Sequence, residues 1–298
     1  MSQHDFRFWR WSHFLALLVT LAFAALLLIP LSAAAKGGGN AKGKVLIVNQ
    51  KNGTVDFGDP CPSPRTSAKY LDVQAAVDCA MAGDTIKIRP GAYESNWDPG
   101  AEEAPDSVQV TKSLNLIGSG INRTVLKNGG VGIGPNAISG DRTVVRISDM
   151  TLAFDVVNQP GEGTGGAILD VGEGARVYAR RLLLSAVSGI PLAYWVGAVG
   201  NKGYLELDEV QIVGNTVVWR GAAVGTGPDS YTRIKRSAIV NNVSQTGDGG
   251  AIYNAGKMDI FKSLVTANRG GGILNDGTIK LRGSVVELNQ GFDCIGCP

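Results

Sequence analysis

Two segments near the end of the chain repeat one pattern of apolar and polar residues in close succession. The segment GGAIYNAGKMDIFKSLVTAN begins at Gly249, and GGILNDGTIKLRGSVVELN begins at Gly271. In both, a Gly-Gly pair precedes a short apolar run, a turn with Asn and Gly follows, and a second apolar run ends at Asn. Within the runs apolar and polar residues alternate at a period of two, and Ile, Val and Leu are frequent. This pattern predicts β-strands rather than amphipathic helices.

The same unit recurs toward the N-terminus in looser form. When the second runs are aligned, the repeats start 21, 26, 27, 28 and 32 residues apart. A period of this size built from short strands predicts a solenoid, whose coils stack at ~4.8 Å and share one core. Asn254 and Asn275 occupy equivalent turns and predict a ladder of stacked asparagine amides. The second runs align through Leu281, Ile260, Ile234, Leu207, Ala179 and Ile147, and the first runs through Ile273, Ile252, Val224, Val199 and Ile168.

Composition agrees with an ordered chain that has many tight turns. Of the 298 residues 41 are Gly, 44% are hydrophobic and 18% are charged. Glycine supplies the backbone conformations that tight turns require, and the apolar fraction suffices for a core. The net charge of +2 gives no electrostatic argument for a nucleic-acid ligand, so none is expected.

The first 35 residues have the features of a signal peptide. Arg7 and Arg10 precede an apolar stretch from Phe14 to Ile29, and the small residues from Ala33 to Ala35 follow it. A retained anchor is the alternative, but this stretch is shorter than the ~20 residues that a spanning helix needs. We therefore expect an exported protein that is secreted, periplasmic or on the cell surface, without a lasting membrane span. Residues 36–44 are a Gly- and Lys-rich linker, and residues 45–298 form one domain.

The chain has four cysteines, all beyond the leader: Cys61, Cys79, Cys294 and Cys297. An even number in an oxidising compartment favours disulfides, and four cysteines allow three pairings. The local pairs Cys61 with Cys79 and Cys294 with Cys297 are preferred. A redox dithiol at Cys294–Cys297 lacks the surrounding βαβ pattern, and a zinc site lacks a second C-x-x-C motif, so no metal is expected.

One segment of the domain predicts a helix, from Leu71 to Ala82. Its apolar residues form a broad face, and Gly83 suits the position just after a helix. A solenoid exposes its core and its strand edges at each end. A helix directly before the first coil is therefore expected to cap the N-terminal end.

Two segments carry a resemblance to a known family. VQAAVDCAMAGDTIKIRPGAYESN from Val73 and VTKSLNLIGSGINRTVLKN from Val110 resemble the opening of the pectin-lyase-like superfamily, and the likeness extends over residues 70–293. It implies an all-β fold, a single-stranded right-handed parallel β-helix (solenoid) with an N-terminal capping α-helix. The later repeats are similar to those of bacterial surface and autotransported β-helix proteins. Many members of the superfamily cleave or bind acidic polysaccharide.

The catalytic motifs of that superfamily are largely missing. Both histidines, His4 and His13, lie in the leader, so chemistry that needs histidine is excluded from the mature chain. Arg233-Ile234-Lys235 matches one motif of the polygalacturonase-type hydrolases, but its partner motifs are absent, and we interpret the match as coincidence. The catalytic residues of any activity remain unknown. No cofactor is expected, except calcium if the chain is a lyase.

The turns before the first strands carry large and charged residues at similar positions, and stacked coils would place them in one stripe. Exposed tryptophans stack on sugar rings, and arginine binds carboxylates with two parallel hydrogen bonds. The alternative is that the tryptophans cover the core and the charges form only an ion-pair ladder. The candidate binding stripe consists of Glu162, Trp195, Trp219, Arg220, Asp248 and Arg269.

The sequence thus favours an exported binding or interaction protein that contacts acidic polysaccharide at the cell surface, and it does not favour an enzyme. One alternative is a divergent pectate-lyase-like polysaccharide lyase or glycoside hydrolase. Another is a structural or adhesive surface protein that oligomerises through its C-terminal coil.

Overall fold

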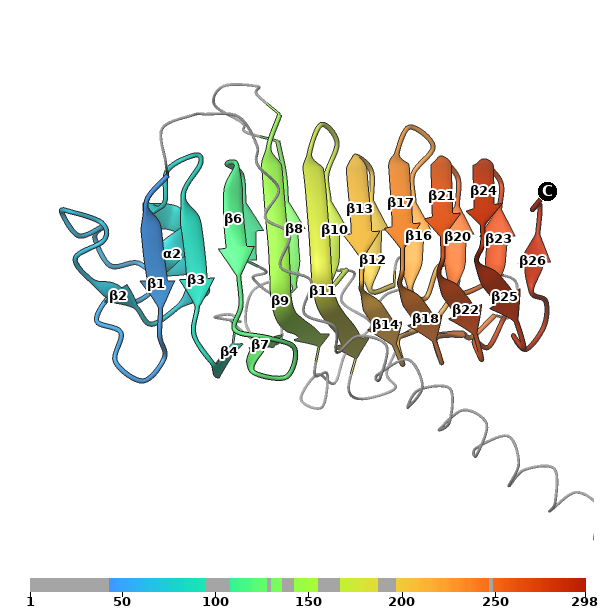
Figure 1. Cartoon of the computed structure of the whole chain (residues 1–298), viewed down its shortest axis with the longest axis horizontal. Coiled ribbons are helices and arrows are strands. Elements are labelled where there is room, and N and C mark those ends of the chain that lie inside the picture. The colour runs from blue at the N-terminus through green and yellow to red at the C-terminus, as the bar shows by residue number, and fades with distance from the viewer. Residues whose placement is uncertain are drawn as a thin grey trace, which may run out of the picture. The chain divides into compact units, whose positions relative to one another are not determined.

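A computed structural model describes most of the chain beyond the predicted leader. The residues from Lys42 to Pro298 form one compact unit, which is all-β with long parallel sheets (Figure 1). The predicted signal peptide and most of the linker lie outside the described residues. The described residues are 43–94, 108–127, 130–135, 142–154, 167–186, 197–246 and 249–298.

The strands form three sheets, named A, B and C here, and their strand pairs are parallel. Sheet A has 16 strands: β1 (Val45–Val48), β2 (Lys69–Tyr70), β3 (Thr85–Ile88), β4 (Gly91–Glu94), β6 (Leu114–Ile117), β7 (Thr124–Lys127), β9 (Val144–Phe154), β11 (Arg176–Ala186), β13 (Tyr204–Asp208), β14 (Gln211–Val213), β17 (Tyr231–Lys235), β18 (Ala238–Val240), β21 (Lys257–Phe261), β22 (Leu264–Thr266), β24 (Thr278–Arg282) and β25 (Val285–Glu287). Sheet B has eight: β5 (Val108–Val110), β8 (Val131–Ile133), β10 (Leu169–Val171), β12 (Val199–Asn201), β16 (Val224–Thr226), β20 (Ile252–Asn254), β23 (Ile273–Asn275) and β26 (Cys294–Ile295). Sheet C consists of β15 (Thr216–Val217) and β19 (Val243–Ser244).

The strand register confirms the predicted alignment of the repeats, with one exception. The residues from Ile147 to Leu281 that were aligned through the second runs are direct partners in sheet A. In sheet B the partner of Val199 is Leu169, so the prediction of Ile168 was wrong by one residue. The side chains of Ile168 and Leu169 are both fully buried, so the apolar pattern does not distinguish these two residues.

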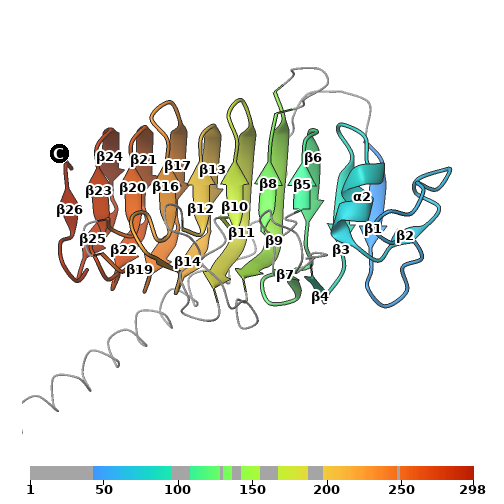
Figure 2. The same cartoon turned by 180° about the vertical axis from the view of Figure 1, so that it is seen from behind.

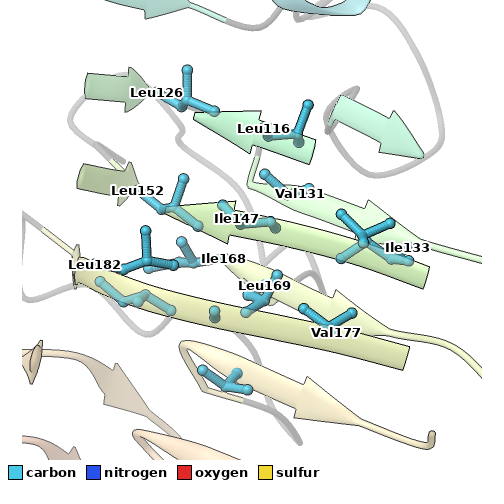
Figure 3. Close-up of a cluster of buried hydrophobic side chains, with 14 of the residues drawn as sticks. Leu116, Leu126, Val131, Ile133, Ile147, Leu152, Ile168, Leu169, Val177 and Leu182 are labelled. Atoms are coloured by element: carbon cyan, nitrogen blue, oxygen red, sulfur yellow. The ribbon is translucent and has the colours of Figure 1, made fainter. Parts of the chain in front are cut away.

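The core lies between sheets A and B, where alternate residues of each strand point inward. Ile147 and Leu152 of sheet A are fully buried, as are Val131 and Leu169 of sheet B. Figure 3 shows these side chains gathered between the two sets of strands. The period-two pattern of the sequence therefore describes the two sides of each strand, one in the core and one outside.

Two asparagine ladders hold the turns. The predicted ladder is confirmed, since Nδ2 of Asn254 donates to Oδ1 of Asn275 at 2.6 Å. A second ladder was not predicted, although in the sequence its members end the second runs of the repeats. In it each Nδ2 donates to the next Oδ1, at 2.9, 3.1 and 2.9 Å, and the members are Asn215, Asn242, Asn268 and Asn289.

The single helix among the described residues, α2, is shorter than predicted. It spans Val73–Cys79 instead of Leu71–Ala82, because Asp72 is its N-cap and Ala80 is already extended. The Asp72 carboxylate accepts hydrogen bonds from the backbone N–H groups of Gln74 and Ala75, which fixes the start of the helix. The two predicted disulfides are present: Cys61 is bonded to Cys79, and Cys294 to Cys297.

Candidate binding surface

Three of the six residues predicted for the binding stripe are among the described residues. Glu162, Trp195 and Asp248 lie outside them. Trp219 and Arg220 lie in the segment between β15 and β16, where 41% of the Trp219 surface is exposed. Arg269 lies between β22 and β23 and is also exposed.

The register does not align Arg269 with the other two. Its backbone forms a parallel bridge with Val243, and Val243 pairs with Thr216, which precedes Trp219 by three residues. The repeat that contains Arg269 has fewer residues between the ladder asparagine Asn268 and sheet B than the repeat that contains Trp219. Counting back from sheet B therefore reached a position that is not equivalent to Trp219. The described members of the stripe therefore do not form one row of equivalent residues, and Arg269 is not in register with Trp219.

A second surface covers the outward side of sheet A from β9 to β24, and the sequence analysis did not identify it. In sheet A, the residues directly before and after each aligned residue from Ile147 to Leu281 point outward. The residue three positions before the aligned one also points outward. Basic side chains far outnumber acidic ones here, although the whole chain has a net charge of only +2. We call this surface the basic face; its charged and aromatic members are Arg146, Arg176, Tyr178, Arg180, Tyr204, Glu206, Asp208, Tyr231, Arg233, Lys235, Lys257, Asp259, Phe261, Lys280 and Arg282.

The signal for this surface was already in the aligned repeats. Placing each strand under its neighbour brings Arg146, Tyr178, Glu206, Arg233 and Asp259 into one row, directly before the buried column. The prediction considered only the turns, so this row was overlooked.

Three tyrosines form an aromatic column at the centre of the basic face. The ring centroids of Tyr178 and Tyr204 are 5.7 Å apart, and those of Tyr204 and Tyr231 are 5.4 Å apart with an interplanar angle of 28°. The guanidinium groups of Arg146 and Arg176 lie over the rings of Tyr178 and Tyr204, at 5.3 and 5.5 Å from the centroids. Stacking against each other and the arginines holds the rings in place, and all three tyrosines are half-buried.

The acidic residues beside this column are engaged by bases of neighbouring strands. Lys235 Nζ lies 2.7 Å from Glu206 Oε1, and Arg233 Nη1 lies 3.7 Å from Glu206 Oε2. The Tyr231 hydroxyl donates to Asp259 at 2.6 Å and accepts from Arg233 at 2.8 Å. Burial and the bond to Asp259 raise the pKa of the Tyr231 phenol, so it stays neutral at physiological pH. The acids are therefore largely compensated within the protein.

Several bases of the basic face have no such compensation. Within the part of the chain that the structure describes, five of them form no ion pair with a carboxylate: Arg146, Arg176, Lys257, Lys280 and Arg282. These cations lie on both sides of the paired acids, so the face offers an anionic ligand positive charge along its length.

Asp208 differs from the other acids of the face. Its Oδ2 is bound by Arg236, whereas its Oδ1 is buried and has no hydrogen-bond partner. Burial raises the pKa of Asp208 despite the opposing effect of Arg236. A carboxyl group in this setting holds its proton to higher pH than an exposed aspartate.

Sheet A bends at a row of residues in the left-handed conformation, and charges cluster there as well. Asp149 has φ 61° and Arg181 has φ 50°, and the two side chains form a bidentate pair with distances of 2.5 and 2.7 Å. Burial acts to raise the pKa of Asp149, but the bonds from Arg181 and Ser148 together hold it below its usual value. These contacts tie successive repeats together beside the basic face.

Arg233-Ile234-Lys235, interpreted from the sequence as a coincidental match, lies at the centre of the basic face. Ile234 is fully buried, and Arg233 and Lys235 point outward and share Glu206. Among the described residues no group of three or more His, Cys, Asp or Glu is placed to hold a metal ion. In the same part of the chain no helix is both long and apolar enough to cross a membrane.

Comparisons with known proteins leave the basic face as the main guide to function, because no family model, no curated protein and no solved structure matches the chain.

Proposed function

We propose that this chain is an exported binding protein that holds an acidic polysaccharide along the basic face of a right-handed parallel β-helix. The fold proposal rests on the register, in which each repeat adds a strand to sheet A and to sheet B beside the previous one. The resemblance to the pectin-lyase-like superfamily supports the same assignment. Export is supported by the leader and by two disulfides, which persist in oxidising compartments.

Helix α2 is proposed as the cap of the N-terminal end. The Gln74 side chain accepts a hydrogen bond from the backbone N–H of Gln109 in β5 at 2.8 Å, and its amide donates to the carbonyl of the same residue at 3.4 Å. Lys112 Nζ donates to the carbonyls of Asp78 and Ala80, both at 3.0 Å. The Gln74 side chain thus occupies backbone groups of the first strand of sheet B, which otherwise offer an edge for strand pairing, and Lys112 binds the end of α2.

The observation that carries the binding proposal is the set of uncompensated bases around the tyrosine column. Arginine and lysine bind the carboxylates of uronic acids, and the tyrosine column between them adds aromatic surface. Six strands from β9 to β24 at ~4.8 Å spacing give a surface roughly 24 Å long, enough for a short oligosaccharide. A neutral polysaccharide would leave the bases without partners, so we favour an acidic one.

The test is titration of the full chain with a uronic acid oligosaccharide, with a neutral oligosaccharide of equal length as ligand control. The double variant Lys280→Ala/Arg282→Ala removes two exposed bases and should weaken Kd by about fivefold to a hundredfold, since each hydrogen bond contributes a net ~0.5–1.5 kcal/mol. The loss should shrink at high salt, because screening already weakens exposed ionic contacts.

The matched control is Lys51→Ala/Arg269→Ala, which removes two exposed bases that lie outside the basic face. It should leave Kd within about twofold of the parent. Equal weakening by both double variants would mean that only the net charge matters, and the proposed surface would be wrong. Failure of the parent chain to bind any uronate would reject the function itself.

A glycoside hydrolase or lyase is the second candidate, and Asp208 favours it. A general acid needs a raised pKa, and Glu206 lies two positions before Asp208 on the same side of β13. Release of reducing ends or unsaturated products from a uronate polymer, with and without calcium, tests this candidate. If product appears, Asp208→Asn should abolish it; without product release this second candidate is rejected.

A further inference from the structure

Arg220, one of the residues of the predicted stripe, does not belong to the basic face, and its side chain is held in place by Gly249 and Tyr253. A Cβ added to Gly249 would lie 2.3 Å from the Trp219 carbonyl oxygen and 2.7 Å from Cγ of Arg220. The absence of a side chain at Gly249 therefore lets the aliphatic part of Arg220 pack against the backbone there. The guanidinium group lies over the ring of Tyr253, 5.3 Å from its centroid. Arg220 is therefore oriented before any ligand arrives.

The donors of this guanidinium group are largely unused. Asp276 approaches Nη1 only to 3.9 Å, and the two side chains are 41% and 52% exposed. An ion pair between such exposed groups contributes little, and the described residues provide no hydrogen-bond acceptor for the Arg220 side chain. A planar guanidinium that is stacked on one side and free at its edge is suited to a carboxylate, which accepts two parallel N–H bonds.

Trp219 precedes Arg220 in the chain and adds an aromatic side chain to the same segment. Its backbone is fixed to the next repeat, because the hydroxyl groups of Ser244 and Thr246 both donate to the Trp219 carbonyl oxygen. The side chain nevertheless remains 41% exposed. An exposed indole is the side chain best suited to pack against a sugar ring, and tryptophan, tyrosine and arginine are the residues most often dominant in binding sites.

The location of this cluster differs from that of the basic face. Tyr253 is the outward residue of β20 in sheet B, with buried residues on either side of it. Tyr231 and Arg233 lie on the outward side of sheet A. Sheet A faces the viewer in Figure 1, and sheet B does so in Figure 2, which is turned by 180°. The two aromatic and basic clusters are therefore on opposite sides of the molecule.

We propose that Trp219, Arg220 and Tyr253 form a second site for a carboxylated sugar unit, so that one molecule bridges two polysaccharide chains. This inference rests on the proposed function of the basic face as the first site. Two sites on opposite sides cannot engage adjacent units of one short oligosaccharide, but they join separate polymers into a network. Each added contact between two long polymers then benefits from the high local concentration of the next site.

The test uses the full chain with two probes, a short uronic acid oligosaccharide and the corresponding long polymer. Titration with the short probe should give two sites per molecule, and light scattering with the long polymer should rise as chains are bridged. Trp219→Ala and Arg220→Ala should each leave one site, with its Kd changed by less than about twofold, and should abolish the rise in scattering. Arg220→Lys keeps the charge but loses the planar fork, and should weaken the second site by about tenfold.

The outcomes separate the two proposals. If Lys280→Ala/Arg282→Ala weakens binding and Trp219→Ala and Arg220→Ala leave both the site number and scattering unchanged, the second site is wrong and the basic face stands. If only the Trp219 and Arg220 variants lose binding, the basic face is wrong and bridging is excluded. Scattering that rises without polymer would show self-association through this cluster and would also overturn the inference. Melting curves of all variants ensure that a lost site does not reflect unfolding.

Discussion

Replacing Asn242, an inner member of the second asparagine ladder, by alanine should strongly destabilise the fold. Asn242 is fully buried. Its Oδ1 accepts from the backbone N–H of Asn215 at 3.1 Å and from the side-chain amide of Asn215 at 2.9 Å. Its Nδ2 donates to the carbonyls of Ile212 and Val240, at 3.0 and 3.2 Å, and to Oδ1 of Asn268 at 3.1 Å.

The expected magnitude follows from what the truncation leaves behind. Alanine removes all of these bonds and strands several buried donors and acceptors in a place that water does not reach. Each unsatisfied buried group costs ~1–3 kcal/mol, and part of this is relieved where neighbours find other partners. We therefore expect Asn242→Ala to lower the free energy of unfolding by about 3–5 kcal/mol.

Asn289→Ala is the matched control at the other end of the same ladder. The Asn289 side chain also bonds Asn268 and two backbone carbonyls, but it is partly exposed, so water replaces what is lost. We expect a loss of about 1–2 kcal/mol. Urea unfolding followed by circular dichroism measures both variants against the parent, with the slope m checked for constancy. Equal losses in the two variants would refute the argument that burial of the ladder sets its contribution.

Two further predictions test charges inside the fold. Asp84 is 2% exposed, and its carboxylate accepts from two backbone N–H groups and from Arg65 at 2.9 Å. Asp84→Ala should therefore lower the free energy of unfolding by about 3–5 kcal/mol, as measured by urea unfolding. A loss under about 1 kcal/mol would contradict this role. The lowered pKa of Asp149 means that its pair with Arg181 stabilises the folded state above the usual value of 3.8 and loses this effect as the pH falls below it. Asp149→Asn, which tolerates the left-handed backbone, should therefore cost about 0.5–1 kcal/mol at pH ~7 and progressively less as the pH falls below 3.8, and a difference independent of pH would contradict the assignment.

Strand positions and register were accessible from the sequence because both depend on local chemistry. The side-chain period of two places Ile234 in the core and Arg233 outside it, whatever the neighbouring strands are. Asn and Gly mark the turns, so equivalent residues align from repeat to repeat. The register failed only at Ile168, where its neighbour Leu169 is equally apolar and the pattern contains no choice between them.

The helix and the binding stripe were less accessible for a different reason. An apolar face over residues 71–82 predicts a helix, but α2 ends at Cys79, because Ala80 is already extended. The stripe was located by counting through turns, and the turns differ in length between repeats. Arg269 therefore lies beside the asparagine ladder, in register with Val243 rather than with Trp219.

The sequence by itself determined which residues of each strand face the core and where the chain turns, because backbone geometry and turn chemistry act over a few residues. The tertiary structure decided how the side chains of the outward residues contact one another. Tyr178, Tyr204 and Tyr231 are separated by 26 and 27 residues along the chain, yet neighbouring strands bring their rings within 5.7 and 5.4 Å. The aligned repeats already indicate that outward residues of neighbouring strands form rows. Which rings stack and which bases pair with acids depends on side-chain conformations across several strands, and only the tertiary structure decides these contacts.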